Sequence, residues 1–313
     1  MKVLVVGGAG FIGSHLCDAL LLEGNEVVCL DNFSNGTKEN IKHLRKNKYF
    51  KLYEKDASVF EDVDGIVESE KVDYVFHLAA NSDIQASASN PEIEYRNTYT
   101  TTFQILHSMR KHGVKKLFFA STSAVYGDKR DVVLDENTPN LAPISYYGAA
   151  KLGSEALISA FSYMNDMQVL VFRFPNVIGP RLTHGVIFDF IKKLEDNPKH
   201  LQILGDGRQT KPYIYISDLV DAIMSFKNIN LQGVTLYNVS VEGATCVKSI
   251  ADIICEEMDL DDVEYEYTGG EGGWKGDVPK FEYCIDKIHA AGWKAMLTSD
   301  EAVRETVRQN IRG

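Results

Sequence analysis

The sequence predicts an α/β fold, a doubly wound parallel sheet with a smaller α/β domain interwoven with it. Three observations support this prediction. Apolar runs typical of strands alternate with helix-like segments through residues 1–175. Most runs are unbroken, as in strands buried on both faces of a parallel sheet. The alternation fails after Gly179. We therefore expect one domain over 1–175, to which 213–240 returns, and a second over 176–212 and 241–313.

The first strand and the turn after it organise the rest of the chain. Residues 3–6 are aliphatic, and Gly7, Gly10 and Gly13 follow at three-residue spacing. Leu16 and Leu20 then recur at helical spacing, which places the glycines at a strand-to-helix turn. Such a turn points backbone N–H groups and the positive end of a helix dipole at one spot. The sequence therefore predicts an anion site that a pyrophosphate can approach closely.

Asp31 closes a second apolar run, residues 27–30, at the place where a Rossmann fold binds the adenosine ribose. A carboxylate there accepts hydrogen bonds from the ribose hydroxyls and repels a 2′-phosphate, which favours NAD over NADP. The alternative is a solvated acid in the turn after a strand. The order of strand, glycines, helix, strand and acid favours a dinucleotide site.

The remaining elements follow in order. In the first domain we expect a polar loop at 32–36, helices at 37–48, 63–70, 95–112 and 147–164, and strands at 50–53, 72–78, 116–120 and 168–174. Gly113 is placed to cap the helix before it. Later we expect helices at 186–197 and 218–226 and strands at 201–204 and 235–239. Ligands of such a sheet bind beyond the carboxyl ends of its strands.

Composition narrows the functional class. The 313 residues carry a formal net charge of -11, which argues against nucleic acid or an acidic membrane as a partner. The five cysteines lack a CxxC pair, which suits a reducing cytoplasm. We expect no signal peptide, because a strand begins almost at Met1, and no membrane span or metal site.

A tyrosine and a lysine four residues apart carry the predicted chemistry. Tyr147 and Lys151 share one helix face, and Thr122 ends the preceding strand. Lysine and the positive nicotinamide would both lower the pKa of the phenol, making Tyr147 a general base for a substrate hydroxyl. The alternative is a half-solvated helix face, which is the commoner origin of such a pair. Tyr146 competes, but no lysine stands four residues after it.

These motifs resemble those of the extended short-chain dehydrogenases/reductases, specifically the nucleotide-sugar epimerases of the UDP-glucose 4-epimerase type. The resemblance runs nearly end to end. It rests on residues 7–13 (GGAGFIG), 31–32 (DN), Asp56, 77–80 (HLAA), Asn97, 121–127 (STSAVYG), Tyr147 with Lys151, 173–176 (RFPN), 205–207 (GDG), 213–216 (YIYI) and 276–279 (GDVP).

The resemblance implies roles for individual residues. The implied NAD contacts are Gly7, Gly10, Phe11, Ile12, Asp31, Asn32, Asn35, Gly36, Asp56, Ala57, Leu78, Ala79, Ala80, Asn97, Ser121, Tyr147, Lys151 and Pro175. The implied catalytic set is Thr122, Tyr147 and Lys151, and the implied sugar-nucleotide contacts are Thr122, Asn176, Arg181, Val186, Gln202, Lys211 and Asp277. Asn97 is equally compatible with a polar helix contact, Asp277 with a loop acid, and His77 with a buried core histidine.

Departures from the family pattern bear on the reaction. Related dehydratases carry an acid just after the hydroxyl residue of the fifth strand, where this chain has Ser123 and Ala124. Lys211 replaces an arginine that would grip the diphosphate as a fork. Phe281 falls where family members control room for an N-acetyl group, and its bulk disfavours acetamido sugars.

The resemblance therefore implies an NAD-dependent epimerase that inverts C4 of a UDP-hexose through a 4-keto intermediate. One alternative is an NAD-dependent reductase or an epimerase for another nucleotide sugar, and a remote one is a non-catalytic NAD-sensing scaffold. A homodimer is expected by resemblance, paired through helices 95–112 and 147–164. Their apolar residues are equally compatible with an intramolecular core: Phe103, Leu106, Met109, Leu157, Phe161 and Met164.

Overall fold

The computed structural model describes residues 1–313 except 82–83, 131, 230–231, 271–275, 277 and 312–313. The chain forms two compact units. Unit 1 comprises Met1–Val125, Leu141–Arg173 and Ile223–Tyr237, and unit 2 comprises Tyr126–Asn140, Phe174–Ala222 and Asn238–Gly313. The expected division differs chiefly in two places. Residues 126–140 belong to unit 2, and the segment that returns to unit 1 begins at Ile223 instead of residue 213.

Unit 1 is built on a seven-stranded sheet in the order β12-β7-β5-β4-β1-β2-β3. Its strands are β1 (Lys2–Val6), β2 (Glu26–Asp31), β3 (Phe50–Glu54), β4 (Tyr74–His77), β5 (Lys116–Thr122), β7 (Gln168–Phe174) and β12 (Val234–Asn238). The pairings from β3 to β5 are parallel, and Val5 of β1 lies between Cys29 of β2 and Phe76 of β4. The strand order reverses between β1 and β4, which confirms the doubly wound sheet and puts the expected ligand crevice at their carboxyl ends.

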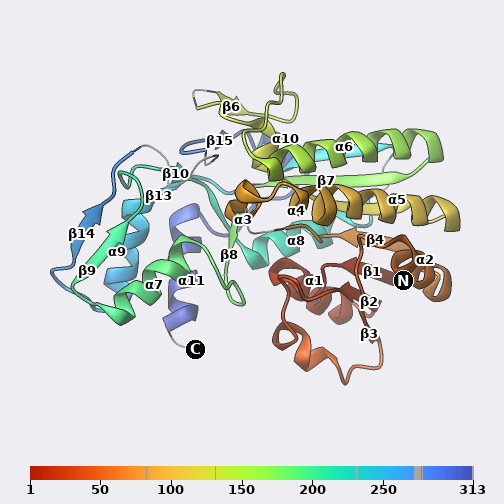
Figure 1. The fold of residues 1–313 in the computed structure, drawn as a ribbon, viewed down its shortest axis with the longest axis horizontal. Helices are drawn as coiled ribbons and strands as arrows, with labels where there is room; N and C mark the ends of the chain where they lie inside the picture. The colour runs from red at the N-terminus through yellow and green to blue at the C-terminus, as the bar shows by residue number, and fades with distance from the viewer. Residues whose placement is uncertain (82–83, 131, 230–231, 271–275, 277, 312–313) are drawn as a thin grey trace. The chain divides into compact units, whose positions relative to one another are not determined.

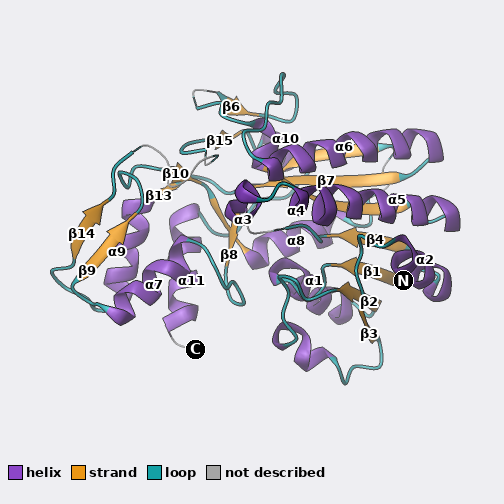
Figure 2. Ribbon diagram, in the orientation of Figure 1, coloured by secondary structure: helices purple, strands orange, loops and turns teal. Residues whose placement is uncertain are grey.

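Helices connect these strands, as Figures 1 and 2 show. They are α1 (Phe11–Leu22), η1 (Glu39–Leu44), α2 (Phe60–Glu70), α3 (Ile84–Ser89), α4 (Glu92–Glu94), η2 (Tyr95–Thr100), α5 (Thr101–His112), η3 (Ser123–Tyr126) and α6 (Tyr146–Asn165). Leu4, Val75 and Leu117 of the sheet pack with Leu106 of α5 and Ile158 of α6, all less than 1% exposed. The unbroken apolar strands are thus covered by helices, which accounts for their lack of alternation.

Two expected helices differ in the structure. Within the expected helix 37–48 only Glu39–Leu44 are helical, as the 3-10 helix η1, whose two buried apolar residues, Ile41 and Leu44, stand three apart. The expected helix 95–112 is a π-helical turn, η2, followed by α5. Thr102 donates to the Thr98 carbonyl at 2.8 Å, the kind of side-chain bond that competes with regular helix geometry. Gly113 caps α5 in the left-handed conformation, at φ 72°, as expected.

Unit 2 consists of small sheets and helices. The strands are β6 (Val133–Leu134), β8 (Asn176–Ile178), β9 (His200–Ile203), β10 (Thr210–Lys211), β11 (Tyr213–Tyr215), β13 (Thr245–Cys246), β14 (Glu264–Tyr267) and β15 (Glu282–Tyr283). The helices are α7 (Val186–Asp196), α8 (Ile216–Phe226, which continues into unit 1), α9 (Val247–Glu257), α10 (Asp286–Ala290) and α11 (Ser299–Ile311). Its own core includes Phe190, Leu201, Ile250 and Val303.

Helix length and composition bear on membrane insertion. Within the described ranges, no helix is both long and apolar enough to cross a bilayer.

Candidate active site

The glycine turn between β1 and α1 is close-packed backbone. Gly7 donates its N–H to the Leu30 carbonyl at 2.8 Å and has a φ of +82°, which favours glycine. A Cβ on Gly13 would lie 2.0 Å from the Gly7 oxygen, so a side chain there has no room. Gly10 caps α1 without a side chain. The first N–H groups of the helix are therefore left for an anion, as a pyrophosphate site requires.

Asp31 is fixed against this turn. Its carboxylate is 7% exposed and accepts hydrogen bonds from the Ala9 and Phe33 N–H groups, each at 2.8 Å. Burial raises the pKa of Asp31, and the backbone bonds oppose that rise. The Gly10 N–H also hydrogen-bonds this carboxylate, which fixes its orientation at the position where a dinucleotide's ribose hydroxyls bind. A Cβ on Gly36 would lie 2.9 Å from the Ala9 backbone, so the loop after β2 also closes on the turn.

The structure brings Thr122, Tyr147 and Lys151 together. Thr122 is the last residue of β5 and hydrogen-bonds Tyr147, which lies at the start of α6. One helical turn later Lys151 is 2% exposed, with its ammonium 5.9 Å from the centre of the Tyr147 ring. That ammonium donates to the Ala120 carbonyl at 2.6 Å. The competing Tyr146 is 51% exposed, so the structure favours Tyr147.

Burial dominates the protonation of this pair. It raises the pKa of Tyr147, with a further rise from the negative charge of Glu94, while the Thr122 bond lowers it. Burial lowers the pKa of Lys151 to about 8, and Glu94 and Glu155 raise it in part. The sequence predicted a lowered pKa for Tyr147. In the structure the pKa is raised instead. The prediction included the positive charge of a bound nicotinamide, and the structure contains the protein alone.

Three local features position Tyr147. Ser145 caps α6, its side chain accepting the Gly148 N–H at 3.1 Å. A Cβ on Gly148 would lie 2.6 Å from the Ala124 oxygen, so the helix start packs directly on η3. A Cβ on Gly153 would meet the Tyr99 ring at 3.0 Å, so α6 also lies close to η2. The tyrosine therefore stands on a helix whose first turns have little freedom to move.

The sequence did not predict a buried polar cluster that acts on Tyr147 and Lys151. Glu94, at the end of α4, is 1% exposed and accepts hydrogen bonds from Asn81 Nδ2 at 2.8 Å and Thr98 Oγ1 at 2.7 Å. Its charge acts on both Tyr147 and Lys151. No pattern in the sequence indicates this burial, because a glutamate in a short charged segment is usually exposed to solvent.

A second missed group is an ion pair behind the lysine. Glu155 of α6 accepts two hydrogen bonds from Arg173 of β7, at 2.6 and 3.0 Å, and a third from the Ser121 hydroxyl. Arg173 is 4% exposed. Ser121 was expected to contact NAD, and here its hydroxyl is directed to Glu155. The signal available in the sequence was the lysine-to-glutamate spacing of four residues on α6.

Other implied NAD contacts lie at or near the carboxyl ends of the strands. Asp56 pairs with Arg96 at 2.7 Å and accepts the Ser58 N–H at 2.8 Å. His77 is fully buried and bonds Thr102 at 2.9 Å, which supports a core role. In η2 it is Thr98, the neighbour of Asn97, that donates to Glu94 and accepts the Asn81 N–H. The rest lie around the turn and strand ends: Phe11, Ile12, Asn32, Asn35, Ala57, Leu78, Ala79 and Ala80, whereas Pro175 belongs to unit 2.

Most implied sugar-nucleotide residues belong to unit 2. Asn176 and Gln202 are exposed on β8 and β9, and Gln202 donates to Glu266 at 3.3 Å. Arg181 has a left-handed backbone, at φ 70°. Val186 begins α7 after Gly185, and Lys211 is partly buried on β10. Asp277 lies outside the described residues.

The chain matches known proteins over its whole length. Residues 3–239 match the NAD dependent epimerase/dehydratase family. A relative from Methanocaldococcus jannaschii, named a putative UDP-glucose 4-epimerase, is 31% identical over 97% of each chain. The structure of UDP-glucose 4-epimerase from Thermotoga maritima with UDP-glucose is 30% identical, with a TM-score of 0.90 over 100% of this chain and 99% of that one. That from Thermus thermophilus in complex with NAD is 29% identical, with a TM-score of 0.88 over the same shares.

The names of other relatives extend the substrate range to UDP-glucuronate and UDP-arabinose. These relatives are named 4-epimerases and differ in the sugar, while a more distant relative is named a dTDP-D-glucose 4,6-dehydratase. With the glycine turn, Asp31 and the Thr122, Tyr147 and Lys151 arrangement described above, the chain belongs to the NAD-dependent epimerase/dehydratase family, among the nucleotide-sugar 4-epimerases.

Proposed function

We propose that this protein inverts C4 of a UDP-hexose, interconverting UDP-glucose and UDP-galactose. The observation that carries the proposal is the hydrogen-bonded Thr122 and Tyr147 pair with Lys151 one helical turn away. A hydroxyl group bound beside this pair has both a proton acceptor and a hydrogen-bond partner for its oxygen.

The residues divide the work by their chemistry. Tyr147 takes the proton of the 4-hydroxyl group during oxidation and returns it during reduction. Thr122 holds the same oxygen throughout. Lys151, whose pKa of about 8 keeps it mainly protonated near neutral pH, contributes positive charge that favours the phenolate. NAD held at the glycine turn and Asp31 would supply a reversible hydride acceptor for C4, so that no net oxidation would result.

The groups after Thr122 favour epimerisation over dehydration. Expelling water from the sugar requires an acid or base next to the catalytic hydroxyl. Ser123 and Ala124 of η3 occupy those positions, and neither side chain does acid–base work. The 4-keto sugar is therefore expected to be reduced again on its opposite face.

Phe281 supports a hexose without an acetamido group. In unit 2 its side chain is 6% exposed, with its ring centre 5.6 Å from that of Tyr283, which in turn lies 6.1 Å from Tyr126. A ring held by such edge-to-face contacts has little room to move aside. If Phe281 borders the sugar, as the resemblance implies, an N-acetyl group is excluded.

The test is to incubate the purified protein with UDP-glucose and no added cofactor, and to analyse for UDP-galactose. Parallel reactions contain UDP-glucuronate, a UDP-pentose or UDP-N-acetylglucosamine at the same concentration. Conversion of UDP-glucose without net NADH formation is the expected result. Conversion of another sugar nucleotide alone would reassign the substrate, and stoichiometric consumption of NADH would indicate a reductase.

A homodimer and a cytoplasmic location complete the proposal. Of the six apolar residues considered for pairing, Leu106 and Met109 are fully buried, and Leu157 and Phe161 pack against the core of unit 1. Phe103 and Met164 are exposed, at 40% and 75%, and are left for a partner. Light scattering on the purified protein measures the mass of the particle and so distinguishes a dimer from a monomer.

The five cysteines are all free thiols, which suits a reducing compartment such as the cytoplasm.

A further inference from the structure

The buried side chain of Glu94 acts electrostatically on both Tyr147 and Lys151 and has no role in the proposed reaction so far. Both of its oxygens accept hydrogen bonds, Oε1 from Asn81 and Oε2 from Thr98. The amide nitrogen of Asn81 can only donate, and Thr98 Oγ1 also accepts the Asn81 backbone N–H at 3.3 Å. Acceptance on both oxygens is the pattern of an ionised carboxylate.

A buried negative charge requires a compensating positive charge. Lys151 is the cation on which Glu94 acts, and it is itself 2% exposed. The helices that carry them, α4 and α6, pack against each other, and η2 packs against both. The hydrogen bonds from Asn81 and Thr98, together with the Lys151 ammonium, thus compensate for the burial of the Glu94 charge.

Other charged groups around Lys151 have partners of their own. Glu155, on the same helix, is engaged by Arg173 through two hydrogen bonds. His77 of β4 is fully buried, and burial together with the Lys151 charge lowers its pKa, so it is neutral near neutral pH. Arg96 of η2 pairs with Asp56. Glu94 differs from these groups in acting on Lys151 and Tyr147 alike.

We propose that Glu94 is a positioning residue for the proposed reaction, an ionised carboxylate that serves as the fixed counter-charge for Lys151 beside Tyr147. It holds the ammonium in its charged form inside the protein. The same charge opposes ionisation of Tyr147, so the phenol stays protonated until a positive cofactor arrives. The inference rests on the proposed function for its role in turnover, but its electrostatic part does not depend on the substrate.

The experiment measures the pKa of Lys151 in Glu94→Gln, which keeps the shape of the side chain and removes its charge. Lysine labelled with ¹³C at Cε is followed by NMR against pH, and the Lys151 signal is assigned by its absence in Lys151→Met. Variants are compared at equal NAD content. We expect the pKa of Lys151 to fall by about one unit in Glu94→Gln.

Glu92→Gln is the matched control, because Glu92 lies on the same short helix and is exposed. It should leave the Lys151 signal unchanged. Glu94→Asp retains the charge and displaces it by one methylene, so it should titrate close to the wild type. An unchanged Lys151 pKa in folded Glu94→Gln overturns the proposal. If Glu94→Gln does not fold, Glu94→Ala takes its place, and an unchanged Lys151 pKa in that variant overturns the proposal.

Turnover supplies an independent second readout. Because one negative charge acts on both groups, its removal should move both limbs of the pH–rate profile toward lower pH by similar amounts. A purely structural role would lower the rate without moving either limb. The lysine titration needs no substrate, so a protein inactive toward every sugar nucleotide would still test Glu94 while refuting the proposed function.

Discussion

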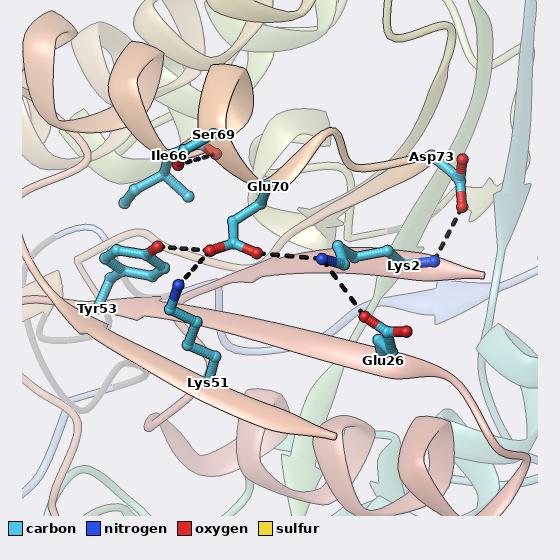
Figure 3. A network of polar contacts seen from close by, with 8 residues as sticks. All are labelled: Lys2, Glu26, Lys51, Tyr53, Ile66, Ser69, Glu70 and Asp73. Carbon is cyan, nitrogen blue, oxygen red and sulfur yellow. Dashed lines mark hydrogen bonds and ion pairs between the residues drawn. The ribbon is translucent and has the colours of Figure 1, made fainter. Parts of the chain in front are cut away.

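Unit 1 contains two groups of the same residue types with opposite consequences. The Glu70 group consists of Lys2, Lys51, Tyr53 and Glu70, with Glu26 beside Lys2 (Figure 3). The Tyr147 group consists of Glu94, Tyr147 and Lys151. Lys2 and Glu26 are the first residues of their strands, whereas Thr122, the partner of Tyr147, is the last of its strand. The two groups therefore lie at opposite ends of the sheet.

The difference lies in direct contact. In the Glu70 group the carboxylate touches Lys51 and Tyr53 at 2.5 Å and Lys2 at 3.2 Å. Burial raises the pKa of Glu70, but these bonds outweigh it and bring the pKa down to about 2. In the Tyr147 group burial outweighs the partners, and both Tyr147 and Lys151 are shifted away from their charged forms. Charges with direct partners stabilise the fold, whereas side chains whose pKa values are shifted toward the neutral form are suited to proton transfer.

Replacing the two tyrosines should separate these roles most strongly. Tyr147→Phe removes the group that exchanges the substrate proton, and we expect turnover to fall by about 10²–10⁴-fold or more while NAD stays bound. Tyr53→Phe removes a hydrogen bond to Glu70 and should leave turnover near that of the wild type. The measurements are the turnover rate and the NAD content of each variant. Near-normal turnover in Tyr147→Phe would contradict the catalytic assignment.

Removing the buried lysine together with its counter-charge should stabilise the protein. The pKa of Lys151 is about 8 in the fold against 10.5 for the free side chain, so the unfolded chain binds the proton more tightly and charge on Lys151 costs stability below about pH 8. The double variant Glu94→Gln with Lys151→Met leaves neither charge buried alone and should raise the free energy of unfolding by about 1–3 kcal/mol near neutral pH. The gain should shrink as the pH rises toward 10.5.

Urea unfolding of the NAD-free wild type and of the double variant measures this difference, because bound cofactor would otherwise add its own stabilisation. Activity should be lost in the double variant. A destabilised double variant at neutral pH would show that the Lys151 bond to Ala120 and the attraction between Glu94 and Lys151 outweigh the cost of burying the two charges.

Removing the charge from the Glu70 group should have the opposite and smaller effect. Glu70→Gln should lower the free energy of unfolding by about 1–2 kcal/mol at neutral pH, allowing for the exposure of Lys51. The pKa of Glu70 is lowered from 4.5 to about 2, so the wild type should lose this advantage as the pH falls through that interval. Unfolding curves of both proteins across the interval provide the check. Equal stability at neutral pH would mean that Lys2 and Lys51 gain nothing from the contact.

The sequence predicted the candidate site from local signals. The spacing of Gly7, Gly10 and Gly13 is set by backbone crowding, as the 2.0 Å approach of a Cβ on Gly13 to Gly7 shows. The spacing of Tyr147 and Lys151 is set by one turn of helix. Such patterns lie in residues that are close together in the chain. The helix expected at 37–48 forms only in part, as the 3-10 helix Glu39–Leu44, in which Ile41 and Leu44 are the buried residues.

The sequence by itself determined the doubly wound sheet, the glycine turn, Asp31 and the tyrosine–lysine pair, since each follows from periodicity or short spacing. Only the tertiary structure decided the protonation of that pair, because burial and the charge of Glu94 come from segments far apart in the chain. Glu94 and Glu70 look alike in the sequence. Their surroundings differ, with two neutral donors around one and two lysines around the other, and in each case folding decides which partners a carboxylate meets.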